Sequence, residues 1–154
     1  MTEVKEILQK VTTKYGKERT ALIPALQAIV KEKRYLNDED IMEVAKTFDL
    51  SSAEVYGTAT FYTFLDTVPR GQYVIRICKT ISCFMAGKDE IINTVSDMLK
   101  IKVGETTVDK KFSLLTANCL GWCHKGPVML INDEVYTELT PQKAIEIIQS
   151  YQQK

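Results

Sequence analysis

Histidine and long apolar runs are scarce in this 154-residue sequence. His124 is the only histidine, so no nucleophile–base pair of the Ser–His or Cys–His kind is apparent. No apolar stretch approaches the roughly 20 residues that span a bilayer. The polar start MTEVKE also differs from a secretory leader, which needs a basic segment before an apolar one. We therefore expect a cytoplasmic protein with no direct membrane insertion.

Charge of one sign is not in excess. Twenty basic residues balance 20 acidic ones, whereas nucleic-acid binding draws much of its affinity from a basic excess. Neither a G-x-G-x-x-G sequence nor a Walker loop occurs. Nucleic acid is therefore not an expected partner, no nucleotide site is found, and the chain is not expected to be catalytic by itself.

The first part of the chain lacks cysteine and carries helical patterns. Apolar residues recur at intervals of three and four within 4–11, 22–30, 41–48 and 55–62. Asn37, followed by three acidic residues, predicts the start of the third helix. Ser51-x-x-Glu54 resembles the capping box that opens a helix. We predict a helical bundle over residues 1–68, with a role in partner docking.

Beyond Pro69 and Gly71 the pattern changes to short β-rich runs. We predict strands over 73–78 and 112–116, separated by a helix over 88–100. A hairpin follows, with strands over 128–131 and 135–137. Thr140-Pro141 then opens a last helix. The fold class is therefore α+β (α/β), with a second domain over residues 69–154.

All four cysteines lie in the second domain, as two close pairs. Cys78 and Cys83 form a C-x4-C pair, Cys119 and Cys123 form a C-x3-C pair, and 35 residues separate the pairs. Each pair follows a predicted strand, so both are expected in loops at one edge of the sheet. Four thiolates there would supply the ligand set of a [2Fe–2S] or [4Fe–4S] centre. These four cysteines are the candidate metal and cofactor ligands.

Other uses of four cysteines compete with an iron–sulfur centre. Single buried free cysteines are common, and structural zinc also takes four thiolates. The C-x-x-C of a redox dithiol and the C-x4-C-x2-C of plant-type ferredoxins are absent. One histidine excludes the two-histidine Rieske centre. The spacing therefore predicts a metal site without choosing the metal.

Turn-forming residues surround the second cysteine pair. Gly121, Gly126 and Pro127 let backbone N–H groups approach sulfur, and such hydrogen bonds tune the reduction potential of a cluster. We expect the hydroxyl of Ser82, beside Cys83, to be solvated, with donation to sulfur as the alternative.

The spacing C-x4-C-x35-C-x3-C, with NCLGWC over 118–123 and GPVM over 126–129, resembles the thioredoxin-like [2Fe–2S] ferredoxin family. More closely, it resembles the 24 kDa-type small subunit of NADH-oxidising complexes. The segments 22–27, 54–62 and 132–141 also match that subunit's pattern. The resemblance implies a helical bundle followed by a thioredoxin-like domain with a mixed sheet. It also implies one [2Fe–2S] cluster, and a larger flavoprotein partner that binds FMN and NAD(H).

The resemblance extends to several parent complexes. Such subunits occur in respiratory complex I, in NAD-linked formate dehydrogenases and hydrogenases, and in electron-bifurcating [FeFe]-hydrogenases. Because the chain is compact and ends soon after its last predicted helix, we expect the soluble bifurcating hydrogenase type, with a further iron–sulfur catalytic subunit. Complex I and NAD-dependent formate dehydrogenase are the alternatives. A zinc-stabilised interaction module and a free-standing ferredoxin are the rival hypotheses from other classes.

Two positions depart from the family pattern, in which an acidic residue commonly precedes the third cysteine and a small residue the fourth. Asn118 and Trp122 stand there. The missing negative charge, with Lys125 nearby, is expected to raise the reduction potential. We expect Trp122 to pack against a loop or a partner, with cluster shielding as the alternative. We expect His124 to be solvated, with charge tuning of the cluster as the alternative.

Aromatic residues gather near the end of the fourth predicted helix. They are Tyr56, Phe61, Tyr62 and Phe64. We expect them in the core, with a partner-binding surface as the alternative, because aromatic residues are enriched at interfaces.

Overall fold

The computed structural model describes residues 2–153. The chain divides into two compact units, Met1–Pro69 (unit 1) and Arg70–Lys154 (unit 2). The predicted domains, 1–68 and 69–154, include Met1 and Lys154, which lie outside the described residues. Each unit has its own buried apolar cluster. None of the described helices has the length and apolar character that a membrane span requires.

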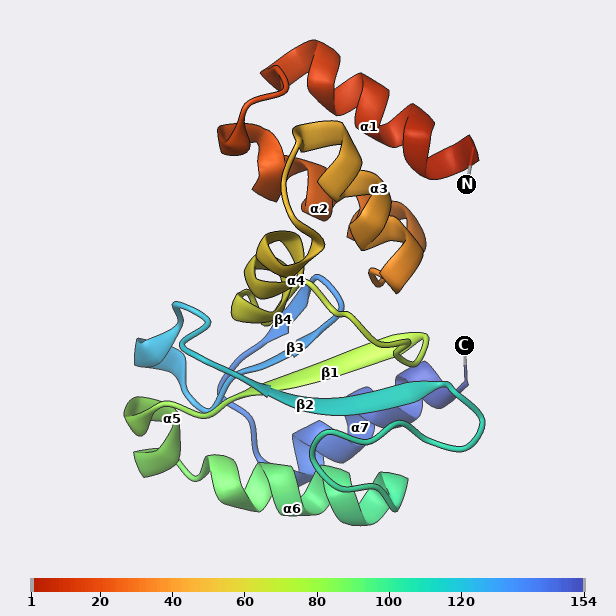
Figure 1. The fold of residues 1–154 in the computed structure, drawn as a ribbon. Helices are drawn as coiled ribbons and strands as arrows, with labels where there is room; N and C mark the ends of the chain where they lie inside the picture. Colours follow the sequence, from red (N-terminus) through yellow and green to blue (C-terminus); the bar gives the residue numbers. More distant parts are fainter. Residues whose placement is uncertain (1, 154) are drawn as a thin grey trace. The chain divides into compact units, whose positions relative to one another are not determined.

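Unit 1 is helical, as the sequence predicts (Figure 1). Its elements are α1 (Thr2–Tyr15), the 3-10 turn η1 (Arg19–Ala21), α2 (Leu22–Lys33), α3 (Asp38–Phe48) and α4 (Ser52–Phe61). The predicted apolar faces meet in one core, to which Leu8, Leu26, Ile29 and Val44 contribute fully buried side chains. Pro24 lies in the first turn of α2, where its missing N–H interrupts no helical hydrogen bond.

Side-chain caps open α3 and α4. The N–H of Asp40 donates to Asn37 Oδ1 at 2.8 Å, and the N–H of Asn37 donates back to Asp40 Oδ2 at 3.1 Å. Ser51 and Glu54 repeat this reciprocal arrangement at the start of α4. Both predicted helix starts are therefore confirmed, and each satisfies two backbone donors that a helix end leaves unpaired.

Unit 2 is an α/β unit built on one four-stranded sheet. Its elements are β1 (Tyr73–Cys78), α5 (Ile81–Met85), α6 (Lys88–Leu99), β2 (Phe112–Ala117), the 3-10 turn η2 (Cys123–Lys125), β3 (Met129–Ile131), β4 (Glu134–Tyr136) and α7 (Pro141–Gln152). The strand order is β2-β1-β3-β4. β1 pairs with β2 in parallel, whereas β3 is antiparallel to both β1 and β4. The sheet is therefore mixed, as expected.

Helices α6 and α7 lie beside each other along the sheet (Figure 1). Ile91 and Val95 of α6 and Ala144 and Ile148 of α7 belong to the same buried cluster as Ile77 of β1. All five side chains are almost completely buried, so the two helices pack closely against β1. The strand that ends at Cys78 is thus part of the packed core of unit 2.

The expectation for the aromatic residues near the end of α4 is wrong. They are exposed rather than buried: Tyr56 by 50%, Phe61 by 76%, Tyr62 by 42% and Phe64 by 48%. The buried face of α4 consists of Val55 and Ala59, four residues apart, and α4 ends at Phe61, so the later aromatic residues leave the helix before they can join that face.

Candidate metal centre

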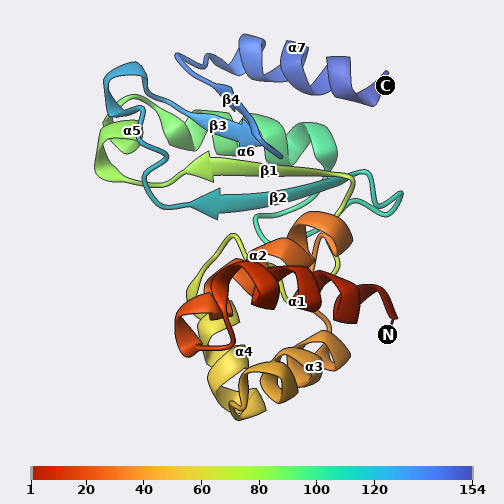
Figure 2. The same cartoon turned by 90° about the horizontal axis from the view of Figure 1, so that it is seen from above.

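Both cysteine pairs lie at the same edge of the sheet. Cys78 is the last residue of β1, and its register partner, Ala117, is the last residue of the parallel strand β2. Figure 2 shows both strands ending toward α5. Cys119 follows β2 by two residues, and Cys83 lies in α5. Because parallel strands end at a common edge, the chain brings together two segments that are far apart in sequence, as predicted. The first pair lies at the end of β1 and in α5 rather than in a loop, because a short helix follows the strand.

The first pair is buried. Cys78 and Cys83 are each only 1% exposed, and they pack in a small cluster with Val128 and Leu120. Their thiols hydrogen-bond to each other, because the short helix α5 turns the chain back over the end of β1. Cys78 Sγ also lies 3.2 Å from the hydroxyl oxygen of Thr80.

The second pair is exposed. Cys119 and Cys123 are both accessible, and their sulfur atoms are 3.1 Å apart. Gly121 has a φ of +88°, a conformation that glycine adopts without strain. This turn directs its N–H to Cys119 Sγ at 3.4 Å. The prediction that glycine brings a backbone donor to sulfur is thus confirmed at Gly121.

Hydrogen bonds also connect the two pairs. The Ser82 hydroxyl interacts with Cys123 rather than with its neighbour Cys83. The N–H of Leu120, in the second loop, donates to Cys78, and the N–H of Val128 donates to Cys83. These backbone donors have no signal in the sequence, because every residue except proline carries one. The geometry therefore places two thiol pairs against each other with N–H groups directed at sulfur.

The thiols differ in their acidity. Burial raises the pKa of Cys83 to about 11, and the hydrogen bond that its thiol donates to Cys78 adds to the shift. Burial acts in the same direction on Cys78, but hydrogen bonds from Thr80, Cys83 and Leu120 outweigh it, so the pKa of Cys78 falls below the ordinary thiol value. The hydrogen bond with Cys119 raises the pKa of Cys123.

The four thiols form two pairs. Among the described residues, no group of three or more Cys, His, Asp or Glu side chains has the geometry of a metal site. A [2Fe–2S] cluster takes two thiolates at each of two irons. Two thiol pairs, with Cys83 and Cys123 close enough to influence each other's charge, match that donor set.

Trp122 and His124 lie beside the exposed pair. Their rings stack with centroids 6.1 Å apart and planes inclined by 25°. Trp122 is 41% exposed, and His124 is exposed. The solvated position expected for His124 is therefore confirmed. Trp122 packs against its own loop, while much of its surface stays accessible.

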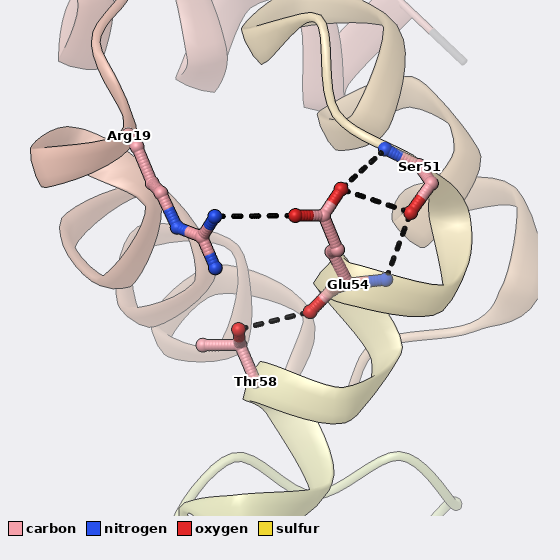
Figure 3. Close-up of polar contacts among 4 residues, drawn as sticks. All are labelled: Arg19, Ser51, Glu54 and Thr58. Carbon is pink, nitrogen blue, oxygen red and sulfur yellow. Dashed lines mark hydrogen bonds and ion pairs between the residues drawn. The ribbon is translucent and has the colours of Figure 1, made fainter.

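Unit 1 carries a separate surface feature. A pocket of about 440 Å³ is lined by Arg19, Leu22, Ile23, Glu54, Gly57, Thr58, Phe61 and Tyr62. The Arg19 guanidinium donates to Glu54 Oε1 at 3.1 Å, while the Ser51 hydroxyl donates to Glu54 Oε2 (Figure 3). The backbone N–H of Ser51 is the main reason that the pKa of Glu54 is lowered. The pocket thus combines an ion pair with exposed apolar walls.

The chain is similar in sequence to subunits of NADH-quinone oxidoreductases. A subunit of NADH-quinone oxidoreductase from Buchnera aphidicola is 37% identical over 137 residues, which cover 89% of this chain and 85% of the relative. A subunit of the Thermus thermophilus NADH-quinone oxidoreductase is 35% identical, with 93% and 80% covered. A subunit of the same kind of enzyme from Escherichia coli is 34% identical, with 96% and 89% covered.

One solved structure shows the same fold in a longer chain. An NAD+-reducing [NiFe]-hydrogenase in the H2-reduced state superposes with a TM-score of 0.72 over 84% of this chain at 24% identity, although this chain spans only 22% of the hydrogenase chain. The family model described as thioredoxin-like [2Fe–2S] ferredoxin matches residues 8–152. That match covers nearly all of both units, and the chain belongs to the thioredoxin-like [2Fe–2S] ferredoxin family.

Proposed function

We propose that Cys78 and Cys83 bind one iron of a [2Fe–2S] cluster, and that Cys119 and Cys123 bind the other. The observation that carries this proposal is the meeting of two thiol pairs at the ends of the parallel strands β1 and β2. The family to which the chain belongs is defined by such a cluster. The N–H groups of Leu120, Gly121 and Val128 would stabilise the negative charge on sulfur.

The role that follows is electron transfer without catalysis by this chain. A bound [2Fe–2S] cluster supplies reversible one-electron chemistry. The protein buries Cys78 and Cys83 and leaves Cys119 and Cys123 at the surface, so water is excluded on one side and a partner can approach on the other. We propose that the partner is a flavoprotein subunit that binds FMN and NAD(H), since the relatives are named as subunits of NADH-quinone oxidoreductases.

For the complex to which the chain belongs, we propose a cytoplasmic, electron-bifurcating [FeFe]-hydrogenase, in which a further iron–sulfur subunit carries the catalytic site. The competing candidate is NADH:quinone oxidoreductase, which the names of the relatives support. An NAD-dependent formate dehydrogenase is the third parent that the family resemblance allows.

The first test is the metal content of the chain. After anaerobic purification, the chain is expected to be brown, to hold about two irons, and to give a rhombic S = 1/2 electron paramagnetic resonance signal after dithionite reduction, as two irons on four thiolates require. A colourless chain with about one zinc would replace the electron-transfer proposal with the zinc-stabilised interaction module.

We further propose that unit 1 docks the flavoprotein through the pocket beside α4. Phe61 is 76% exposed and meets Tyr62 edge to face, with ring centroids 5.1 Å apart. Exposed aromatic side chains beside an apolar pocket are typical of the residues that dominate binding energies at interfaces. A free-standing ferredoxin would not need this surface.

Substitution of Phe61 tests the docking surface. Phe61→Ser is expected to weaken flavoprotein binding by about 10- to 100-fold, the loss typical of an interface aromatic residue. The cluster spectrum should stay unchanged, because the side chain lies in unit 1 and makes little contact with the core. The measurement is the dissociation constant of the flavoprotein for each chain.

Val108→Ser is the matched control. Val108 is fully exposed and belongs to unit 2, so this variant makes the same kind of surface change at a residue that does not line the pocket. Equal affinity of both variants and the wild type would contradict docking through α4. The tagged wild-type complex also identifies the parent: NAD-linked hydrogen turnover supports the hydrogenase, whereas quinone reduction supports complex I.

A further inference from the structure

The two proposed iron ligands at the surface are already close to disulfide geometry. Cys119 Sγ and Cys123 Sγ are 3.1 Å apart, whereas a disulfide bond is about 2.05 Å long. Closing the bond therefore needs a movement of roughly 1 Å. Gly121 and both cysteines are exposed, so the movement takes place at the surface, whereas Leu120 in the same loop packs against the buried cluster.

We propose that, in the chain without a cluster, Cys119 and Cys123 form a reversible dithiol–disulfide centre that reacts with low-molecular-weight disulfides, while Cys78 and Cys83 remain thiols. The site is a modification site of the cluster-free protein. Its oxidation needs neither iron nor a partner subunit. Only its consequence, that the disulfide must be reduced before a cluster is loaded, rests on the proposed function.

The chemistry is two successive thiol–disulfide exchanges. The Cys119 thiolate attacks one sulfur of oxidised glutathione, which forms a mixed disulfide and releases one glutathione thiolate. The Cys123 thiolate then attacks the Cys119 sulfur, which closes the Cys119–Cys123 bond and releases the second glutathione. Two protein thiols are oxidised, one small disulfide is reduced to two thiols, and the two protons pass to the glutathiones.

Contact geometry and exposure place Cys119 for the first exchange. The N–H of Gly121 donates to Cys119 Sγ at 3.4 Å, and both thiols are exposed to a small disulfide in solvent. Cys123 lies within reach for the second exchange. The exposed pair therefore supplies both an attacking and a resolving sulfur.

The buried cysteine pair is not accessible to this reaction. Cys78 and Cys83 are each 1% exposed and packed against Val128. A disulfide of the size of glutathione disulfide must reach the sulfur along the bond that breaks, and the packed side chains prevent that approach. We therefore expect oxidation to stop after one protein disulfide.

The test is differential labelling of the cluster-free, reduced chain. The folded chain is equilibrated with mixtures of reduced and oxidised glutathione, the remaining thiols are trapped with N-ethylmaleimide, and tryptic peptides are weighed. Peptide 112–125, between the cleavage sites at Lys111 and Lys125, contains both exposed cysteines. It is expected to lose two hydrogen atoms and to carry no label, whereas Cys78 and Cys83, in separate peptides, stay fully labelled.

Two results would overturn the proposal. One is a glutathione adduct on peptide 112–125 that persists without internal closure, and the other is loss of label from Cys78 or Cys83 before the exposed pair. Cys123→Ser provides the control: with no resolving sulfur, the variant should accumulate the mixed disulfide on Cys119. Because the substituted side chain is exposed, the variant is expected to fold.

The iron analysis and the labelling experiment test the cluster proposal and the disulfide proposal separately. If the purified chain never holds iron, the assignment of a [2Fe–2S] cluster fails, yet the labelling of the cluster-free chain still decides whether the disulfide forms. If the chain holds iron but peptide 112–125 never closes, the disulfide centre fails and the cluster assignment stands.

Discussion

Replacement of Cys83 by serine is expected to remove the cluster from the purified chain. Loss of an outer hydrogen-bonding partner already costs about 10–100-fold in metal affinity, so loss of a ligand should cost more than about 100-fold. The hydroxyl group would also stand in an apolar cluster with Val128 and Leu120. Iron content, visible absorbance and the electron paramagnetic resonance signal measure the effect.

Two companion variants show whether loss of the cluster reflects ligation or damage to the fold. Cys119→Ser changes a proposed ligand that is exposed, so its loss of iron cannot be attributed to the buried core. Ser82→Ala removes only the hydroxyl that interacts with Cys123, and it should retain the cluster with a shifted reduction potential. Retention of two irons and full complex activity by Cys119→Ser would refute ligation by that residue.

Replacement of Gly71 by alanine is expected to destabilise unit 2 by about 1–3 kcal/mol, the usual effect of forcing an extra carbon into a packed site. A Cβ atom at Gly71 would lie 2.7 Å from the carbonyl carbon of Phe112 and 2.9 Å from its nitrogen. Both are backbone atoms of β2, so they cannot rotate away. The Gly71 N–H, which donates to Ser113 Oγ at 2.8 Å, would be displaced as well.

Thermal unfolding measures this destabilisation. Trp122 is the only tryptophan and lies in unit 2, so its fluorescence reports that unit, and a shift of about 4–8 °C per kcal/mol is expected for a unit of this size. Gly57→Ala is the matched control, because nothing lies within 4 Å of its added carbon and alanine favours the helix by up to about 1 kcal/mol. Unchanged Trp122 unfolding in Gly71→Ala would contradict the close approach of residue 71 to β2.

The sequence predicted the elements best where local signals are strong. The strand over 73–78 has the predicted bounds, because the β-rich run YVIRIC is bounded by a turn and a cysteine loop. The caps at Asn37 and Ser51 were also predictable, since capping depends on residues only three apart. The helix α5 was missed because five residues are too few to show a helical period.

The candidate site was predictable in part. Cysteine spacing and the position of each pair after a strand indicated that the four thiols share one edge of the sheet. Which pair is buried depends on how α5 folds back over β1, and this is a tertiary property. The donors to sulfur at Leu120 and Val128 are backbone groups, which no residue type marks. The aromatic residues near the end of α4 were placed wrongly, because their identity does not reveal where the helix ends.

The parallel pairing of β1 with β2 sets an order of events during synthesis of the chain. Cys78 and Cys83 leave the ribosome before the strand that positions Cys119, and Val128, which donates to Cys83, emerges later still. Contacts between residues distant in sequence also form slowly. Until β2 and β3 have joined β1, an incoming iron would find at most two correctly placed ligands. We therefore expect iron insertion after unit 2 has been translated. Unit 1, which comes first in the chain, has had time to fold by then.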